Sequence, residues 1–188
     1  MKWMAVAVVV LSAASLACAA PVVSASSSAL FADWKVLDGV TVQDGWLADT
    51  RIDGAPWISI DLTGDAGDNG TLKFDSVTVY ANIDAIWAAP EARVSYSTDG
   101  SLWNVLGTYA LSKVNATPTT IAGGGVEAQF VKLEITKDPD GNPYPKVPPA
   151  TPFVGFAELV FATSPVPEPA TMSLLGLGLV GLVLRRKK

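Results

Sequence analysis

The chain has 188 residues, a formal net charge of −5 at pH 7, no histidine and one cysteine. The absence of histidine excludes Ser-His-Asp and Cys-His catalytic arrangements, and with a single cysteine it argues against a typical zinc site. The acidic balance argues against nucleic acid and anionic lipid surfaces as partners, because these partners bind cationic patches.

The first 19 residues have the pattern of a secretory signal peptide. Lys2 precedes an apolar run, and the small residues Ala17 and Ala19 fit an A-x-A cleavage site. Cleavage after Ala19 removes Cys18, so the exported part contains no disulfide and its own core must hold it together. Residues 20–29, which are rich in serine, read as a flexible lead-in.

The central residues 30–162 predict a single domain made of strands. In "PWISIDL", Ile58 and Ile60 alternate with polar residues, which indicates a half-buried strand. In "LKFDSVTVY", the apolar residues change phase near Asp75, and this change predicts a bulge. "YSTDGSLW" reads as a hairpin turn in which Gly100 supplies the positive φ angle.

Two later segments complete the predicted strands. "FVKLEIT" alternates cleanly, with Val131, Leu133 and Ile135 inward, and "VGFAELVF" reads as a largely buried last strand. No central stretch shows a convincing helical period. Short strands separated by Gly, Pro and Asp turns predict an all-β fold of the sandwich or jelly-roll type.

The C-terminal end has three parts. Residues 163–169 read as a short stalk that contains the triplet Pro167, Glu168, Pro169, and residues 170–188 read as a hydrophobic helix with a basic tail. The uncharged run would be about 22 Å long as a helix, whereas a bilayer core is about 30 Å thick. The run therefore reads either as a weak permanent anchor or as a temporary one, with Arg185 and Arg186 on the cytoplasmic side.

Lys2 and the four terminal cations belong to these end segments. Their removal leaves eight basic residues against 18 acidic ones in the exported part, which gives a net charge of −10.

The triplet, the Gly/Leu-rich run and the basic terminus together resemble the PEP-CTERM sorting signal of bacterial envelope proteins. This resemblance implies that an exosortase-like enzyme cuts at or near the triplet. The protein would then be anchored transiently in the inner membrane before it reaches the cell envelope or the extracellular space.

The central segments resemble, in order, a discoidin domain (the coagulation factor 5/8 C-terminal type) of the galactose-binding-like superfamily. The motif "YSTDGSLW" and the strand order carry this resemblance. It implies an eight-stranded β-sandwich with jelly-roll topology that binds sugars, lipids or proteins through loops at one end. It also places Trp57 and Trp103 at core positions of the family.

The same resemblance suggests a structural calcium ion. Bacterial sugar-binding relatives hold calcium between an early Asp-Gly loop and a Glu near the last strand, and the matching residues here are Asp38 and Glu158. Calcium prefers such oxygen ligands. In the alternative interpretation, Glu158 lies on the solvent face of its strand and Asp38 is a turn residue.

Three residues are candidate ligand contacts. Trp87 lies between two strands, where relatives carry ligand-binding loops, and an exposed indole there would stack on a sugar ring; burial over its own loop is the alternative. Tyr144, in a Pro-rich loop, is a weaker candidate of the same kind. Arg93 could hydrogen-bond a ligand, although outward-facing charges on strands are common.

The sequence thus predicts an exported, non-catalytic module that binds carbohydrate, such as an exopolysaccharide of a biofilm. No catalytic residues are predicted, although a glycosidase-type pair of carboxylates is a less favoured possibility. The main alternative is a structural or adhesive envelope protein that uses the β-sandwich for protein-protein contacts.

Overall fold

The computed structural model describes residues 22–26, 33–37, 39, 41, 45–49, 54–63, 71–144 and 153–166. These residues form nine strands and one short 3-10 helix, η1 (Asp33–Leu37). The strands are β1 (Val22–Ala25), β2 (Trp46–Asp49), β3 (Trp57–Asp61), β4 (Leu72–Ala81), β5 (Glu91–Ser97), β6 (Asn104–Ala110), β7 (Thr119–Ala128), β8 (Phe130–Ile135) and β9 (Phe153–Pro165).

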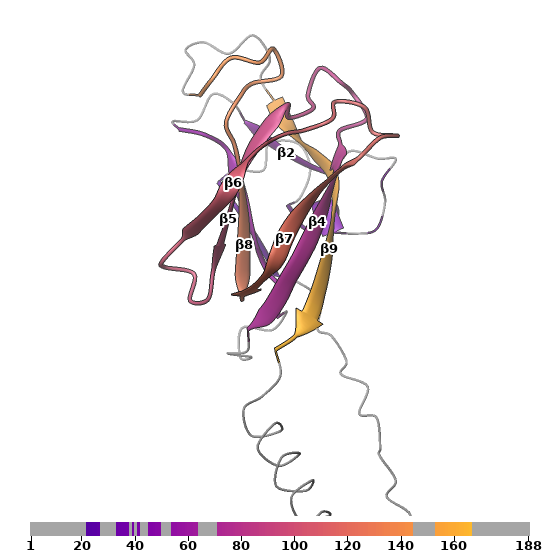
Figure 1. Cartoon of the computed structure of the whole chain (residues 1–188). Helices are drawn as coiled ribbons and strands as arrows, with labels where there is room; N and C mark the ends of the chain where they lie inside the picture. The colour runs from indigo at the N-terminus through magenta and orange to yellow at the C-terminus, as the bar shows by residue number, and fades with distance from the viewer. Residues whose placement is uncertain are drawn as a thin grey trace, which may run out of the picture.

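The strands form two sheets that face each other (Figure 1). Sheet A has the order β1-β3-β8-β5-β6, and sheet B has the order β2-β9-β4-β7. All pairs of neighbouring strands are antiparallel. The prediction of an all-β sandwich is therefore confirmed.

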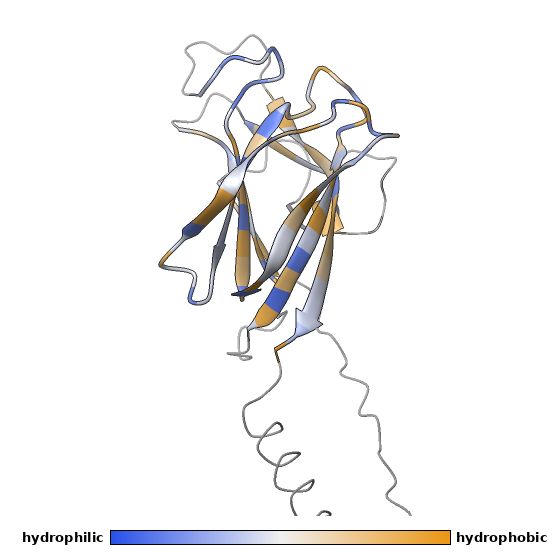
Figure 2. Ribbon diagram, viewed as in Figure 1, coloured by the Kyte–Doolittle hydropathy of each residue, from blue (hydrophilic) through white to orange (hydrophobic). Residues whose placement is uncertain are grey.

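Alternation of apolar and polar residues decides which face of each strand points inward. Ile58 and Ile60 of β3 are fully buried, and Figure 2 shows hydrophobic and hydrophilic residues alternating along β4. The register of β4 with both of its neighbours shifts between Phe74 and Ser76, which confirms the bulge predicted near Asp75. The bulge lets Phe74 and Val77 both reach the core although they are three residues apart.

The core lies between the two sheets, and Trp46 of β2 is part of it. This side chain is 0% exposed, and its ring centroid lies 5.8 Å from that of Phe156 on the neighbouring strand β9. Val131, Leu133 and Ile135 of β8 are fully buried, as their alternation predicted.

Two predicted boundaries differ from the structure. Residues 22–25, expected in a flexible lead-in, instead form the edge strand β1, which pairs with β3. Its register with β3 turns Val23 and Ala25 toward the core, and both pack against the buried cluster. Residues 163–165, expected in a stalk, continue β9 because they still pair with β4.

The two ends of the described sandwich lie at the same end of the fold. Val22 of β1 pairs with Asp61, and Pro165 of β9 pairs with Leu72, at the end of the sandwich where the β5–β6 turn also lies (Figure 1). The segments 82–90 and 136–144 lie at the opposite end (Figure 1). Among the described residues no helix is long and apolar enough to cross a membrane, and the predicted span 170–184 lies outside them.

Candidate functional site

Of the two predicted calcium ligands, only Glu158 is described. It lies on β9 with 3% of its surface exposed, so its alternative placement on the solvent face is wrong. The backbone N–H of Gly39 donates a hydrogen bond to Glu158 Oε1 at 3.2 Å, across 119 positions of sequence. Asp38, the residue before Gly39, lies outside the described residues. The described residues contain no group of three or more Asp, Glu, His or Cys side chains that could hold a metal.

Trp87 lies in the segment between β4 and β5 and is partly buried. Its ring meets Phe153 edge-on, with 6.0 Å between centroids, and its carbonyl accepts a hydrogen bond from the Gly155 N–H at 3.0 Å. The residue therefore fastens its segment to the start of β9. Ile83 and Ile86 on the same segment are more than half exposed.

Arg93 points outward from β5 and forms an ion pair with Glu134 of β8, the residue directly opposite it. The pair is partly exposed, and such surface pairs stabilise proteins by about 1 kcal/mol or less. Arg93 thus lies on the outer face of sheet A and not on the segment that carries Trp87.

Tyr144 is partly buried and packs against the core. Burial, reinforced by the negative charge of Asp138, raises the pKa of the Tyr144 hydroxyl above its usual range. That hydroxyl is buried, and none of the residues that the structure describes forms a hydrogen bond with it. Asp138 also closes the turn before Tyr144, because its carboxylate accepts a hydrogen bond from the Asn142 N–H at 2.8 Å. The acidic segment "DPDGN" is therefore organised as a turn.

The three predicted ligand contacts pack in different places. Trp87 lies against β9, Arg93 pairs with β8, and Tyr144 packs against the core. The predicted sorting residues Pro167, Glu168, Pro169, Arg185 and Arg186 lie outside the described residues.

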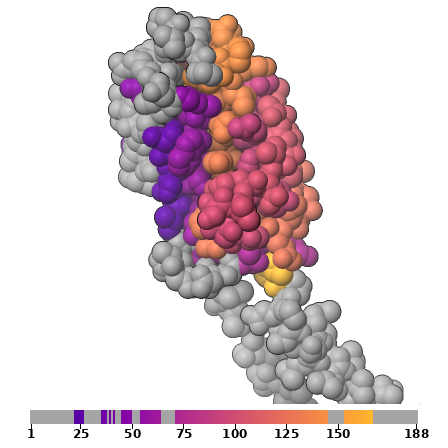
Figure 3. All heavy atoms as spheres, turned by 90° about the vertical axis from the view of Figure 1, so that its left-hand side faces the viewer, coloured from indigo at the N-terminus to yellow at the C-terminus, as the bar shows by residue number. Residues whose placement is uncertain are grey.

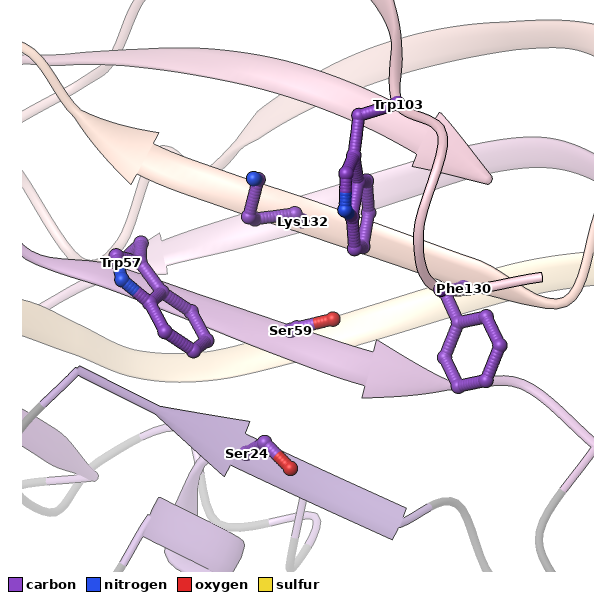
Figure 4. Close-up of a pocket in the computed structure, with 7 residues that line it drawn as sticks. Ser24, Trp57, Ser59, Trp103, Phe130 and Lys132 are labelled. Carbon is purple, nitrogen blue, oxygen red and sulfur yellow. The ribbon is translucent and has the colours of Figure 1, made fainter. Parts of the chain in front are cut away.

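The outer face of sheet A carries a groove that the sequence interpretation missed. Its volume is about 330 Å³, and it is lined by residues from β1, β3, β8 and the β5–β6 turn, namely Ser24, Trp57, Ser59, Gly100, Trp103, Phe130 and Lys132. Figure 3 shows the face to which these strands belong, and Figure 4 shows the side chains. Trp57 and Trp103, expected in the core, are instead partly exposed here.

The face of each groove residue follows from strand geometry. Because Ile58 and Ile60 point inward, Trp57 and Ser59 must point outward, and the same rule turns Phe130 and Lys132 outward on β8. Ser24, Ser59 and Lys132 lie opposite one another on three adjacent strands, and they form the floor of the groove.

Trp103 reaches the groove from the turn before β6. The Lys132 ammonium lies 4.3 Å from the centroid of its ring, a favourable cation–π distance (Figure 4). The turn is held by Asp99, whose carboxylate accepts hydrogen bonds from the backbone N–H groups of Leu102 and Ser101 at 2.9 and 2.8 Å.

These hydrogen bonds, with a further one from the Ser97 hydroxyl, lower the pKa of Asp99. The carboxylate therefore supports the turn fully above the ordinary pKa of aspartate. That support is lost only as the pH falls through the lowered pKa.

A protein-family model, described as the PEP-CTERM protein-sorting motif, matches residues 165–187. This chain carries a PEP-CTERM sorting motif. The match covers the triplet and three of the four terminal basic residues from which the same signal was predicted. No curated protein matches the chain at a significant level.

The sandwich of this PEP-CTERM chain is similar to solved carbohydrate-binding modules. CpGH89CBM32-5 from Clostridium perfringens, solved with GalNAc-beta-1,3-galactose, is 15% identical with a TM-score of 0.57, over 75% of this chain and 94% of the module. The family 32 module of NanJ from the same organism, solved with galactose, is 12% identical with a TM-score of 0.56, over 75% and 92% of the two chains. At these identities the similarity shows the fold.

A family 89 glycoside hydrolase from Clostridium perfringens is also similar, at 14% identity and a TM-score of 0.57. The alignment covers 80% of the PEP-CTERM chain but only 15% of the hydrolase. The shared part is therefore a small portion of that enzyme.

Proposed function

We propose that this protein is an exported, non-catalytic carbohydrate-binding module. The observation that carries the proposal is the groove on sheet A, where three aromatic rings surround two hydroxyls and one ammonium. Binding pockets for small molecules typically combine aromatic walls with a few polar groups that fix orientation. A sugar ring matches this surface because its C–H faces stack on aromatic rings and its hydroxyls hydrogen-bond to polar groups.

The groove chemistry also supports a binding role over a catalytic one. Within the described part of the chain, none of the side chains that line the groove is a carboxylate. Hydrolysis of a glycosidic bond generally needs two carboxyl groups about 5–10 Å apart on either side of that bond. Similarity to modules solved with sugars points in the same direction.

A glycan array tests this function. We expect the folded full-length protein to bind a subset of glycans, and Trp57→Ala to reduce that signal at least tenfold while leaving the circular dichroism spectrum unchanged. A folded protein that binds nothing on a broad array would instead favour the structural or adhesive alternative, in which the sandwich makes protein-protein contacts.

Export is the second part of the proposal. The sorting motif supports passage through the inner membrane, with residues 170–184 as a temporary anchor and an exosortase-like enzyme as the processing partner. The processed protein would then act in the envelope or outside the cell, where an exopolysaccharide of the biofilm is a natural ligand.

We also propose a structural calcium ion beside Glu158. The buried carboxylate accepts a hydrogen bond from Gly39, the residue that follows Asp38 in the sequence, and carboxylate and backbone carbonyl oxygens suit calcium. Glu158, Asp38 and backbone carbonyls would hold the ion. Such an ion would join the early loop to the last strand and stabilise the fold.

Calcium is therefore expected to raise the melting temperature of the full-length protein, whereas magnesium is not. A ligand present at 100 times its Kd stabilises the folded state by about 2.7 kcal/mol, which corresponds to several degrees. The Glu158→Gln variant should lose this response. Identical melting curves in calcium and in EDTA would contradict the proposal.

A further inference from the structure

The aromatic residues of the groove are spaced along the strand direction of sheet A. Phe130, Lys132 and Glu134 are successive outward positions on β8, and Trp57 of β3 lies directly opposite Glu134. Successive outward positions on a strand are about 7 Å apart, so Phe130 and Trp57 are separated by about 13 Å along the strands. Trp103 lies over the Lys132 position between them (Figure 4).

Two of the three rings, those of Phe130 and Trp103, have close neighbours in the structure. A Cβ atom at Gly100 would lie 3.3 Å from the Phe130 ring, so the turn approaches that ring closely. Asp99 holds the backbone just before Trp103 through its hydrogen bond with the Leu102 N–H, and the Lys132 ammonium lies over the Trp103 ring. Platforms that are ordered before binding lose little conformational entropy when a ligand arrives.

The spacing of the three rings exceeds the length of a single sugar ring. Ser24, Ser59 and Lys132 form a row across the strands on the groove floor, so hydrogen-bonding groups lie between the two end rings. A groove of this kind fits several consecutive sugar units lying parallel to the strands. One terminal sugar would occupy only one of the three platforms.

The charges favour a neutral chain. Lys132 is the one charged residue that lines the groove in the described part of the protein, and its ammonium already lies against Trp103. The exported part carries a net charge of −10. A polyanionic polysaccharide would be attracted by the single lysine, but it would be repelled by the negative charge of the rest of the exported part.

We propose that the groove binds an interior stretch of about three units of a neutral linear polysaccharide, with sugar rings on Trp57, Trp103 and Phe130. This inference rests on the proposed carbohydrate-binding function, whose site it specifies.

Calorimetric titration of the full-length protein, in a detergent without a sugar head group, tests the inference. The probes are neutral linear gluco-, xylo-, manno- and galacto-oligosaccharides of increasing length. For the series that binds, affinity should rise at least tenfold from one unit to three and then level off. Trp57→Ala and Phe130→Ala should each remove most of the gain with length, because each removes one end platform.

Two further variants keep the test decisive. Trp87→Ala, on the loop end of the fold, should bind with unchanged affinity. Ser59→Tyr fills the groove floor with an outward-facing side chain and should abolish binding even where Trp57→Ala does not fold.

The outcomes are distinguishable. A single sugar that binds as tightly as three units, or loss of binding in Trp87→Ala but not in Phe130→Ala, would overturn the groove inference and leave the carbohydrate-binding function standing. Binding only to acidic polysaccharides would overturn the neutral class. Absence of binding to every glycan by the folded protein would overturn both proposals.

Discussion

The Gly155→Ala variant is expected to be strongly destabilised, by about 3 kcal/mol, with a melting temperature roughly 10 °C lower. A Cβ atom at Gly155 would lie 1.9 Å from the carbonyl oxygen of Trp46, which belongs to the backbone of the neighbouring strand β2. Relief of this clash requires β2 to move away from β9, and that movement pulls the fully buried Trp46 side chain out of the core. Thermal denaturation followed by circular dichroism measures the effect.

A matched variant separates this packing effect from a general effect of losing glycine. Gly124 on β7 has a φ angle of 72°, and, its chain neighbours aside, no atom of the described residues lies within 4 Å of its Cβ position. Asparagine tolerates this left-handed conformation, so Gly124→Asn should cost less than about 1 kcal/mol. Equal stability of the Gly155→Ala variant and the unmodified protein would contradict the position of β2 against β9.

The second large effect is expected in ligand binding by Trp103→Ala. This change removes the central platform of the groove and the ring against which the Lys132 ammonium lies. Aromatic residues at the centre of a binding surface typically contribute about 2 kcal/mol or more, so affinity for a bound oligosaccharide should fall about 30-fold. Titration calorimetry measures it with the trisaccharide that binds the unmodified protein.

The neighbouring residue provides the control. Leu102 lies in the same turn, is 76% exposed and does not line the groove. Leu102→Ser should therefore leave affinity unchanged. A Trp103→Ala variant that binds as tightly as the unmodified protein would show that the ligand lies elsewhere.

Much of the fold was predictable because alternation reports directly on which side of a strand is buried. The two-residue period of a strand was enough to predict the burial of Ile58, Ile60 and the three inward residues of β8. The bulge near Asp75 could be predicted because the apolar pair Leu72 and Phe74 and the apolar pair Val77 and Val79 do not fit one continuous alternation. By contrast, β1 has four residues and lies in a Ser-rich stretch of the sequence, so its identity as a strand depends on pairing with β3, which local sequence does not encode.

The groove was only partly accessible from sequence. Neighbouring residues of a strand point to opposite faces of the sheet. Trp57 therefore points outward because Ile58 is buried, and Phe130 points outward because Val131 is buried. These two positions could therefore have been assigned to one exposed face. Trp103 could not, because its place depends on a turn and on a shift in the β5–β6 register between Val94 and Ser95. Nor does any local pattern indicate that β3 and β8 are neighbours.

The length of β9 has a consequence for the proposed release of the protein from the membrane. The strand ends at Pro165 and the sorting triplet begins at Pro167, so one residue, Val166, separates the hydrogen-bonded sheet from the predicted cut. A scissile bond normally enters its protease as several extended residues. An enzyme that cuts at or near Pro167 would have to separate the last paired residues of β9 from β4, or cut before these residues pair. Under the proposed processing, the timing of sandwich closure would set when the protein leaves the membrane.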